Sequence, residues 1–282
     1  VDAKAPVSFF AYPGKPSYLV PDNCTVHTLS TPDQDATASL VKLAVALGAT
    51  QAQPRLQAAV RPGRPRGKLT APKVCKAVGH LLPENAILID EAITSGLMLG
   101  AMTAGCPRHD LITLTGGAIG QGLPNAVGAA VACPDRPVVA LVGDGTAMYT
   151  IQALWSMARE NLHVVSIIFN NASYSVLNVE LERVGADSGG VKARSQLDLN
   201  GPRLNFAQLA QGMGVHAVRT NTAEDFTKAL EYALATPGPH LIEALVPESL
   251  SGVKRRVLPW LLRSLPNLPL PLAQALKRKV AP

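Results

Sequence analysis

Six short, nearly continuous apolar runs recur along the chain, and helical segments separate most of them. The runs lie at residues 86–90, 111–115, 137–142, 163–170, 215–218 and 240–245. Strands that are apolar along their whole length are typical of parallel sheets, because helices bury such sheets on both faces. The pattern therefore predicts an α/β fold with a doubly wound, mainly parallel six-stranded sheet and helices on both faces.

The first 50 residues differ from this repeat. Residues 24–29 are predicted to form a strand, and a helix is expected after the cap candidates Ser30 and Thr31, with Pro32 at its first position and Gly48 at its end. One strand and one helix cannot bury a core of their own. This part is therefore predicted to be the end of an α/β domain whose beginning lies before residue 1.

Two further segments differ in composition. Residues 51–68 are rich in Pro, Arg and Gly without periodicity, as in a linker, which leaves residues 69–250 for the sheet domain. Residues 251–282 form a Pro- and Leu-rich tail with seven Lys or Arg and no acid, while the rest has 19 basic and 20 acidic residues. The net charge of +6 thus belongs to the tail, which argues against a nucleic-acid-binding face on the domain. The prolines make the tail a poor membrane span.

The four cysteines form neither a CxxC pair nor a metal-ligand spacing. They are Cys24, Cys75, Cys106 and Cys133. Reduced thiols in a cytoplasmic protein are therefore expected.

Polar and glycine-rich segments follow the first four predicted strands of the sheet. They are "DEAITSG", "TGGAIGQGLPN", "GDGT" and "NNASYSVL". Ligands of open α/β sheets bind outside the carboxyl ends of the strands. The four segments are therefore predicted to converge on one crevice.

The "GDGT" segment has a distinctive chemistry. Gly143 and Gly145 allow a ligand to approach the backbone closely, and the helix after them offers N–H groups to an anion. Asp144 would repel a phosphate unless a cation lay between them, and Mg²⁺ prefers oxygen ligands shared between protein, phosphate and water. Asn171 at the next strand end is a second oxygen ligand, and the Ser173 carbonyl could be a third. The spacing predicts a metal–diphosphate clamp.

GDG, 24 intervening residues and NN, with "GGAIGQGLPN" upstream, resemble the signature of thiamine-diphosphate enzymes. The chain is most similar to the acetolactate synthase and benzoylformate decarboxylase group. The likeness covers roughly residues 70–247, and residues 1–50 resemble the end of that group's central domain. It implies thiamine diphosphate and Mg²⁺ as cofactors, and decarboxylation of a small 2-oxo acid with release of an aldehyde or carboligation.

The resemblance also implies roles for single residues. Asp144, Asn171 and the Ser173 carbonyl would hold Mg²⁺, and Ile119 would be the apolar wedge that bends the cofactor. Residues that would contact the cofactor or line the substrate end are Thr94, Ser95, Gly143, Gly145, Thr146, Tyr174 and Leu177.

The family's activating Glu belongs to a separate amino-terminal domain, and no stretch of these 282 residues resembles it. Activity is therefore expected to need a pyrimidine-binding domain, from the full-length protein or another chain, in a homodimer or homotetramer. Neither nucleic acid nor a membrane span is expected.

Several alternatives stay open. The glycine-rich segment does not match the dinucleotide-binding motif GxGxxG. Gly120 and Gly122 fit its first two glycines, but Asn125 stands at the position of the last. Glu91 is either a general acid or structural, Ile119 could pack in the core, and Thr94 and Ser95 could cap a helix. The chain could also be a catalytically inactive homologue that acts as a subunit or regulatory partner. A further alternative is a module that binds nucleic acid or a membrane surface through its basic tail.

Overall fold

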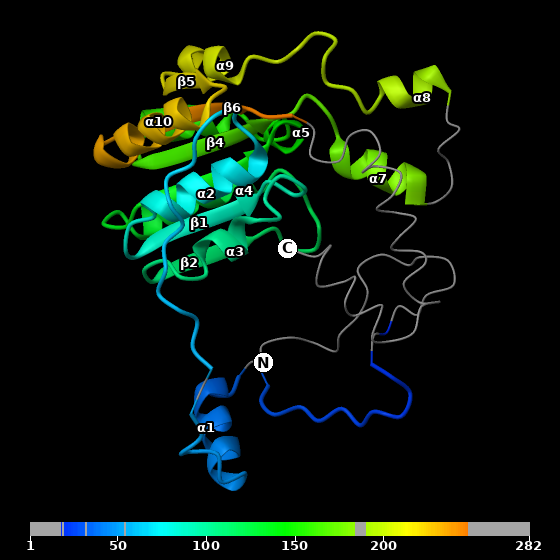
Figure 1. The fold of residues 1–282 in the computed structure, drawn as a ribbon, viewed down its shortest axis with the longest axis vertical. Helices are drawn as coiled ribbons and strands as arrows, with labels where there is room; N and C mark the ends of the chain where they lie inside the picture. The colour runs from blue at the N-terminus through cyan, green and yellow to red at the C-terminus, as the bar shows by residue number, and fades with distance from the viewer. Residues whose placement is uncertain (1–17, 19, 32, 54, 184–189, 248–282) are drawn as a thin grey trace. The chain divides into compact units, whose positions relative to one another are not determined.

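The computed structural model describes residues 18, 20–31, 33–53, 55–183 and 190–247 (Figure 1). The chain divides into two compact units between Gln57 and Ala58. This division falls inside the segment for which the composition predicts a linker. The predicted tail, residues 251–282, lies outside the described residues.

The first unit contains one helix, α1 (Ala36–Ala46), within its described residues. Asp35 caps it, because its Oδ1 accepts a hydrogen bond from the Ala38 N–H at 2.9 Å. The prediction of Ser30 and Thr31 as caps is therefore wrong, and Pro32 lies outside the described residues. The carboxylate of Asp35 is placed at the first free N–H groups of the helix, whereas the two hydroxyl residues precede a turn. The predicted end at Gly48 is confirmed by its φ of 63°.

The prediction of a strand at residues 24–29 is also wrong. These residues have no regular secondary structure and are exposed. A strand is stable only when a neighbouring strand accepts and donates its backbone hydrogen bonds. No such partner pairs with them among the residues that the structure describes.

The second unit is built on a six-stranded sheet in which every neighbouring pair is parallel. The strands are β1 (Ala86–Glu91), β2 (His109–Thr113), β3 (Val138–Gly143), β4 (Val164–Asn170), β5 (His216–Thr220) and β6 (His240–Leu245). Their order is β2-β1-β3-β4-β6-β5. The predicted fold class is confirmed. The central strands β3 and β4 are almost completely buried, as their nearly continuous apolar runs predict.

The predicted bounds of β2 are wrong by two residues, because β2 begins at His109 rather than Leu111. Its pairing decides this: His109 lies opposite Ala86 and Thr113 opposite Asp90. Backbone pairing with β1 thus determines where the edge strand starts, whereas the run of apolar side chains does not. Leu111 and Ile112 of this strand remain partly exposed.

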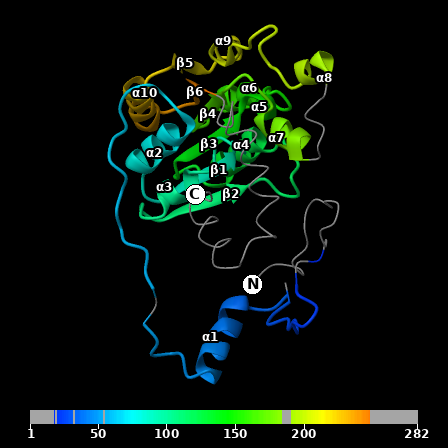
Figure 2. The same cartoon turned by 45° about the vertical axis from the view of Figure 1, so that its right-hand side comes forward.

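Helices cover both faces of the sheet (Figure 2). One face packs against α2 (Ala71–Leu81), α3 (Leu99–Thr103) and α10 (Ala223–Ala235). The other face packs against α4 (Gly122–Ala132), α6 (Ala153–Arg159) and α9 (Phe206–Gly212). Three shorter or more peripheral helices follow strand ends or lie in a loop: α5 (Asp144–Ala147), α7 (Ser175–Arg183) and α8 (Val191–Ser195).

The four cysteines are free thiols, and only Cys75 is fully buried. None of the helices in the described part of the chain combines the length and the apolar character that a membrane span needs.

Candidate functional site

Hydrogen bonds join the four segments that follow β1, β2, β3 and β4 at the carboxyl edge of the sheet. Thr146 Oγ1 donates to the Gly143 carbonyl at 2.8 Å and lies 3.4 Å from the Glu91 carbonyl. Thr150 Oγ1 donates to the Gly120 carbonyl at 2.7 Å. These contacts connect the loop after β3 to those after β1 and β2. The sequence prediction that the segments meet at one edge is thus realised in the fold.

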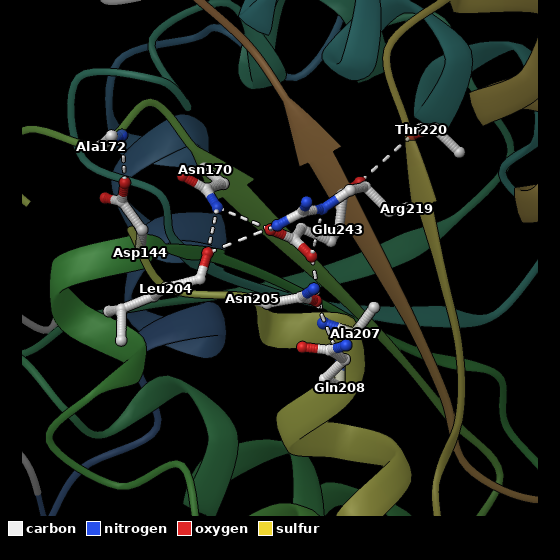
Figure 3. Close-up of polar contacts among 10 residues, drawn as sticks. All are labelled: Asp144, Asn170, Ala172, Leu204, Asn205, Ala207, Gln208, Arg219, Thr220 and Glu243. Carbon is white, nitrogen blue, oxygen red and sulfur yellow. Dashed lines mark hydrogen bonds and ion pairs between the residues drawn. The ribbon is translucent and has the colours of Figure 1, made fainter. Parts of the chain in front are cut away.

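Asp144 and the turn after β4 are in direct contact. The Ala172 N–H donates to Asp144 Oδ2 at 2.6 Å (Figure 3). The Gly145 N–H donates to Asp144 Oδ1 at 2.9 Å. The contact forms because β3 and β4 are adjacent and parallel, with Gly143 opposite Phe169. The two predicted metal ligands on either side of Ala172, Asn171 and Ser173, therefore lie beside Asp144.

Burial makes the Asp144 carboxylate costly to ionise. Its residue is only 4% exposed. Desolvation raises its pKa to about 6, while the backbone hydrogen bonds act in the opposite direction. A nearby divalent cation would offset this cost by stabilising the charged form.

The predicted ligands would offer only oxygen atoms to a metal. Asn171 Oδ1 accepts a hydrogen bond from the Ser173 N–H at 2.9 Å, and an amide oxygen has two lone pairs. The Asp144 oxygens also accept backbone N–H groups, Oδ1 from Gly145 and Oδ2 from Ala172. The set of a carboxylate, an amide oxygen and a backbone carbonyl suits Mg²⁺. Within the described residues no group of three His, Cys, Asp or Glu side chains could hold a metal, so a metal here would need this mixed set.

Two non-glycine residues with unusual backbone conformations lie at this edge. Ile93 has a φ of 50° in the turn after β1, and Ala172 has a φ of 55° between Asn171 and Ser173. A left-handed conformation is uncommon for a non-glycine residue and a genuine outlier for a β-branched one. Such strain concentrates at functional sites, where the surrounding contacts hold it in place.

Gly145 is required by the packing of the site. A Cβ at this position would overlap the ring of Tyr174, with Cδ1 at 2.7 Å. Tyr174 thus covers the GDG turn, although the sequence assigned it only to the ends of the cofactor. Leu177 lies one helical turn further along α7 and is 46% exposed.

The turn after β1 holds Thr94 and Ser95. Ser95 is buried and Thr94 half-buried. The alternative that either caps the next helix is wrong, because α3 begins at Leu99 after Met98 without a side-chain cap.

Glu91 is a structural anchor that the sequence left undecided. Its residue is 1% exposed, and its carboxylate accepts the N–H groups of Gly120, Gln121 and Gly122 at 2.7, 3.0 and 2.9 Å. The loop that carries the half-buried Ile119 is therefore fastened to the end of β1. All three donors are backbone groups of this loop. The Glu91 carboxylate therefore fixes the position of the loop.

A cavity of about 250 Å³ lies beside the predicted metal ligands. It is lined by Asn171, Ala172, Ser173, Asn178, Arg194, Leu197, Asp198 and Asn200. Part of this lining comes from the connection between α7 and α9. In its described part, Tyr174 N–H donates to the Leu197 carbonyl and Leu199 N–H to the Ala172 carbonyl. A larger hollow of about 590 Å³ lies at the opposite edge of the sheet, among residues that include the Arg136–Asp110 ion pair.

The roles of the predicted site residues at a cofactor stay predictions. The structure brings Asp144, Asn171 and Ser173 together and places Gly143, Gly145 and Thr146 beside them. Leu177 is exposed on α7.

Known proteins resemble the chain both in sequence and in fold. It is 54% identical over 246 residues to a candidate acetolactate synthase large subunit, IlvX, of Mycobacterium tuberculosis, covering 87% of this chain and 47% of that protein. It is 33% identical over 193 residues to a benzoylformate decarboxylase of Pseudomonas aeruginosa, covering 68% of this chain and 35% of that protein.

Among solved structures, a thiamine diphosphate-dependent 4-hydroxybenzoylformate decarboxylase of Rhodococcus jostii matches with a TM-score of 0.63 and 32% identity. That match covers 76% of this chain and 40% of the other. The chain thus spans less than half the length of each of these relatives.

A family model also matches more than half of the chain. It describes the C-terminal TPP-binding domain of thiamine pyrophosphate enzymes and covers residues 96–244. This range includes β2 to β5, all but the last residue of β6, and the GDG and NN turns. The chain therefore belongs to the thiamine pyrophosphate enzymes, as the resemblance in its sequence predicts.

Proposed function

We propose that this chain takes part in thiamine-diphosphate- and Mg²⁺-dependent decarboxylation of a small 2-oxo acid, followed by aldehyde release or carboligation. The observation that carries the proposal is the contact between the buried Asp144 carboxylate and the Ala172 N–H. It joins the GDG turn to the turn with Asn171 and Ser173. The names of the relatives, an acetolactate synthase subunit and a benzoylformate decarboxylase, support this class of reaction.

Asp144, Asn171 and the carbonyl of Ser173 would hold Mg²⁺. The proposal is supported by the oxygen-only donor set and by the contact of the buried Asp144 carboxylate with the turn that carries the other two residues. The Asp144 carboxylate must be ionised to bind a cation. The N–H groups of Gly145 and Ala172 favour its ionised form. They stabilise the charged form without a competing positive side chain.

The remaining site residues would bind and orient the cofactor. Thr94, Ser95 and Thr146 would offer hydroxyl groups to the diphosphate, while Gly143 and Gly145 keep the backbone accessible. Ile119, on the loop held by Glu91, would support the bent cofactor from an apolar side. Tyr174 and Leu177 would line the two ends. When bound, thiamine diphosphate supplies the electron sink for loss of carbon dioxide.

The aminopyrimidine end of the cofactor needs the family's activating Glu. We propose that a pyrimidine-binding domain supplies it, from the full-length protein or another chain, in a homodimer or homotetramer. A cytoplasmic location is part of the proposal, and the four free thiols support it.

Calorimetric titration of the full-length protein with thiamine diphosphate and Mg²⁺ tests the metal clamp. The wild type should release binding heat, and Asp144→Ala should lose it. Asp135→Ala is the matched control, because Asp135 is an exposed carboxylate at the opposite edge of the sheet. If Asp144→Ala binds with unchanged affinity, the proposed function is wrong.

A further inference from the structure

A second buried carboxylate lies behind the predicted metal site, on β6. Glu243 is 0% exposed. Its Oε1 accepts from Asn170 Nδ2 at 2.6 Å and from Arg219 Nη2 at 2.9 Å, and its Oε2 accepts from Arg219 Nε at 3.0 Å and from the Ala207 N–H at 3.1 Å (Figure 3). Burial alone would raise the pKa of Glu243, yet the donors from Arg219, Ala207 and Asn170 outweigh it and leave that pKa lowered. The side chain is thus a fully engaged anion.

One of these contacts fixes the residue that precedes the predicted ligand Asn171. Asn170 ends β4, is 1% exposed, and donates its side-chain amide to Glu243 and, at 3.3 Å, to the Leu204 carbonyl. Its backbone carbonyl accepts the Val246 N–H at 3.2 Å. Asn170 therefore points into the protein. The first Asn of the NN pair serves the fold, and the turn to Asn171 starts from a fixed position.

The same carboxylate fastens the loop that returns to the site. Ala207 belongs to the first turn of α9, and the Leu204 carbonyl accepts from Asn170 and, at 3.4 Å, from Arg219. Further back in this loop, the Leu197 carbonyl accepts the Tyr174 N–H at 3.0 Å. The Leu199 N–H donates to the Ala172 carbonyl at 2.9 Å. The turn at residues 171–174 is thus held from β4 and from residues 197–199 of the loop. Glu243 contacts β4 through Asn170 and the end of the same loop through Ala207.

We propose that Glu243 is a positioning residue of the predicted metal site. It acts through Asn170 and through residues 204–207, and it holds the turn at 171–174 where Ala172 meets Asp144. Arg219 serves the same purpose by neutralising the buried charge. The proposal rests on the proposed function in taking Mg²⁺ as the ion, while the positioning itself is a property of the metal-free protein.

The test compares two variants with a matched control. Glu243→Gln removes the charge but keeps the shape, and Arg219→Gln removes the cation from a side chain that is 38% exposed. The control is Arg64→Gln, which breaks another two-bond Arg–Glu pair, to Glu231 at 2.6 and 2.8 Å. That pair is exposed on both sides and joins residue 64 to α10.

Two measurements on the intact protein decide the matter. Hydrogen exchange of the metal-free protein should be faster at the Ala172 and Tyr174 amides in both test variants, relative to amides of β1 and β3. Titration of Mg²⁺ at saturating thiamine diphosphate should show an apparent Kd that rises about tenfold or more, the usual effect of removing a residue that supports metal ligands. Arg64→Gln should change neither result.

A purely structural role predicts a different outcome. In that case the variants would unfold more easily, but exchange at 171–174 and the Mg²⁺ affinity of the folded protein would match Arg64→Gln, and the proposal would be overturned. If Glu243→Gln does not fold, Arg219→Gln decides alone. If the wild type binds no cofactor, the proposed function fails, and the exchange measurement still decides whether Glu243 positions the turn.

Discussion

At the scale of single residues, this site depends on carboxylates that are buried but held by defined donors. Asp144 accepts backbone N–H groups that include those of Gly145 and Ala172. Glu91 accepts three backbone N–H groups. Glu243 accepts one backbone N–H group together with side-chain donors from Asn170 and Arg219. A buried charge without such partners would cost several kcal/mol, about what a small domain can spare. The same residue type thus serves ligand binding and support, depending on which donors surround it.

Gly145→Ala tests the packing at the GDG turn. The added methyl group would overlap the Tyr174 ring, so we expect a loss of about 1–3 kcal/mol in the free energy of unfolding. Gly128→Ala is the control, because nothing lies within 4 Å of a Cβ at this exposed position of α4. Alanine should stabilise that helix by up to about 1 kcal/mol. Urea denaturation measures both, and equal values for the two variants would contradict the assigned role of Gly145.

Glu243 gives the stability a specific pH dependence. Its folded-state pKa is lowered, so it contributes stability above the unfolded value of 4.5, and this is lost as the pH falls through the folded pKa. We expect the wild type to lose stability below pH 4.5 more steeply than Glu243→Gln. Urea denaturation between pH 3 and 7 measures this. The exposed Glu231, whose pKa the Arg64 pair also lowers, should contribute less because solvent screens it. If the free energy of unfolding falls equally steeply below pH 4.5 in the wild type and in Glu243→Gln, the prediction is wrong.

At the scale of elements, adjacent parallel strands bring distant segments of the chain together. The order β1-β3-β4 places the ends of three strands side by side, and the loop after β2 returns to β1 through Glu91. The strained residues Ile93 and Ala172 lie in two of these connections. The positions of the site residues thus follow from strand pairing and from buried carboxylates, such as Glu91, that hold single loops. Substituting one of these carboxylates should loosen the loop that it holds and leave the other loops unchanged.

Glu91→Gln tests the anchor of the loop with Ile119. A glutamine has one acceptor oxygen, and its NH₂ group would face backbone N–H donors that it cannot satisfy. We expect about 1–3 kcal/mol less stability and faster hydrogen exchange at residues 116–122. Glu160→Gln is the control, because it removes only an exposed pair with Arg159 and should leave both nearly unchanged. Unaltered exchange at 116–122 in Glu91→Gln would refute the anchor.

At the scale of the whole molecule, cofactor binding should appear as stability. A ligand that binds only the folded state at 100 times its Kd adds about 2.7 kcal/mol to the free energy of unfolding. We expect thiamine diphosphate and Mg²⁺ together to raise the thermal midpoint of the full-length protein more than either alone. The rise should vanish in Asp144→Ala and persist in Asp135→Ala. An equal rise in both variants would place the metal elsewhere.

The sequence by itself determined the class of fold and the family. Nearly continuous apolar runs are expected wherever a strand is covered on both faces, so β1, β3, β4 and β6 could be placed nearly to the residue. The GDG and NN spacing identified the two turns, because one helix and one strand return the chain to the same edge of a parallel sheet.

Only the tertiary structure decided which groups act as supports. Glu243 interrupts the apolar run of β6, a visible signal, but its partners Asn170, Arg219 and Ala207 come from three other segments. The role of Glu91, the start of β2 and the absence of a strand at 24–29 likewise depend on partners far away in the chain. Side-chain periodicity reports burial, whereas hydrogen bonds between distant segments exist only after the chain has folded, and these bonds hold the site in place.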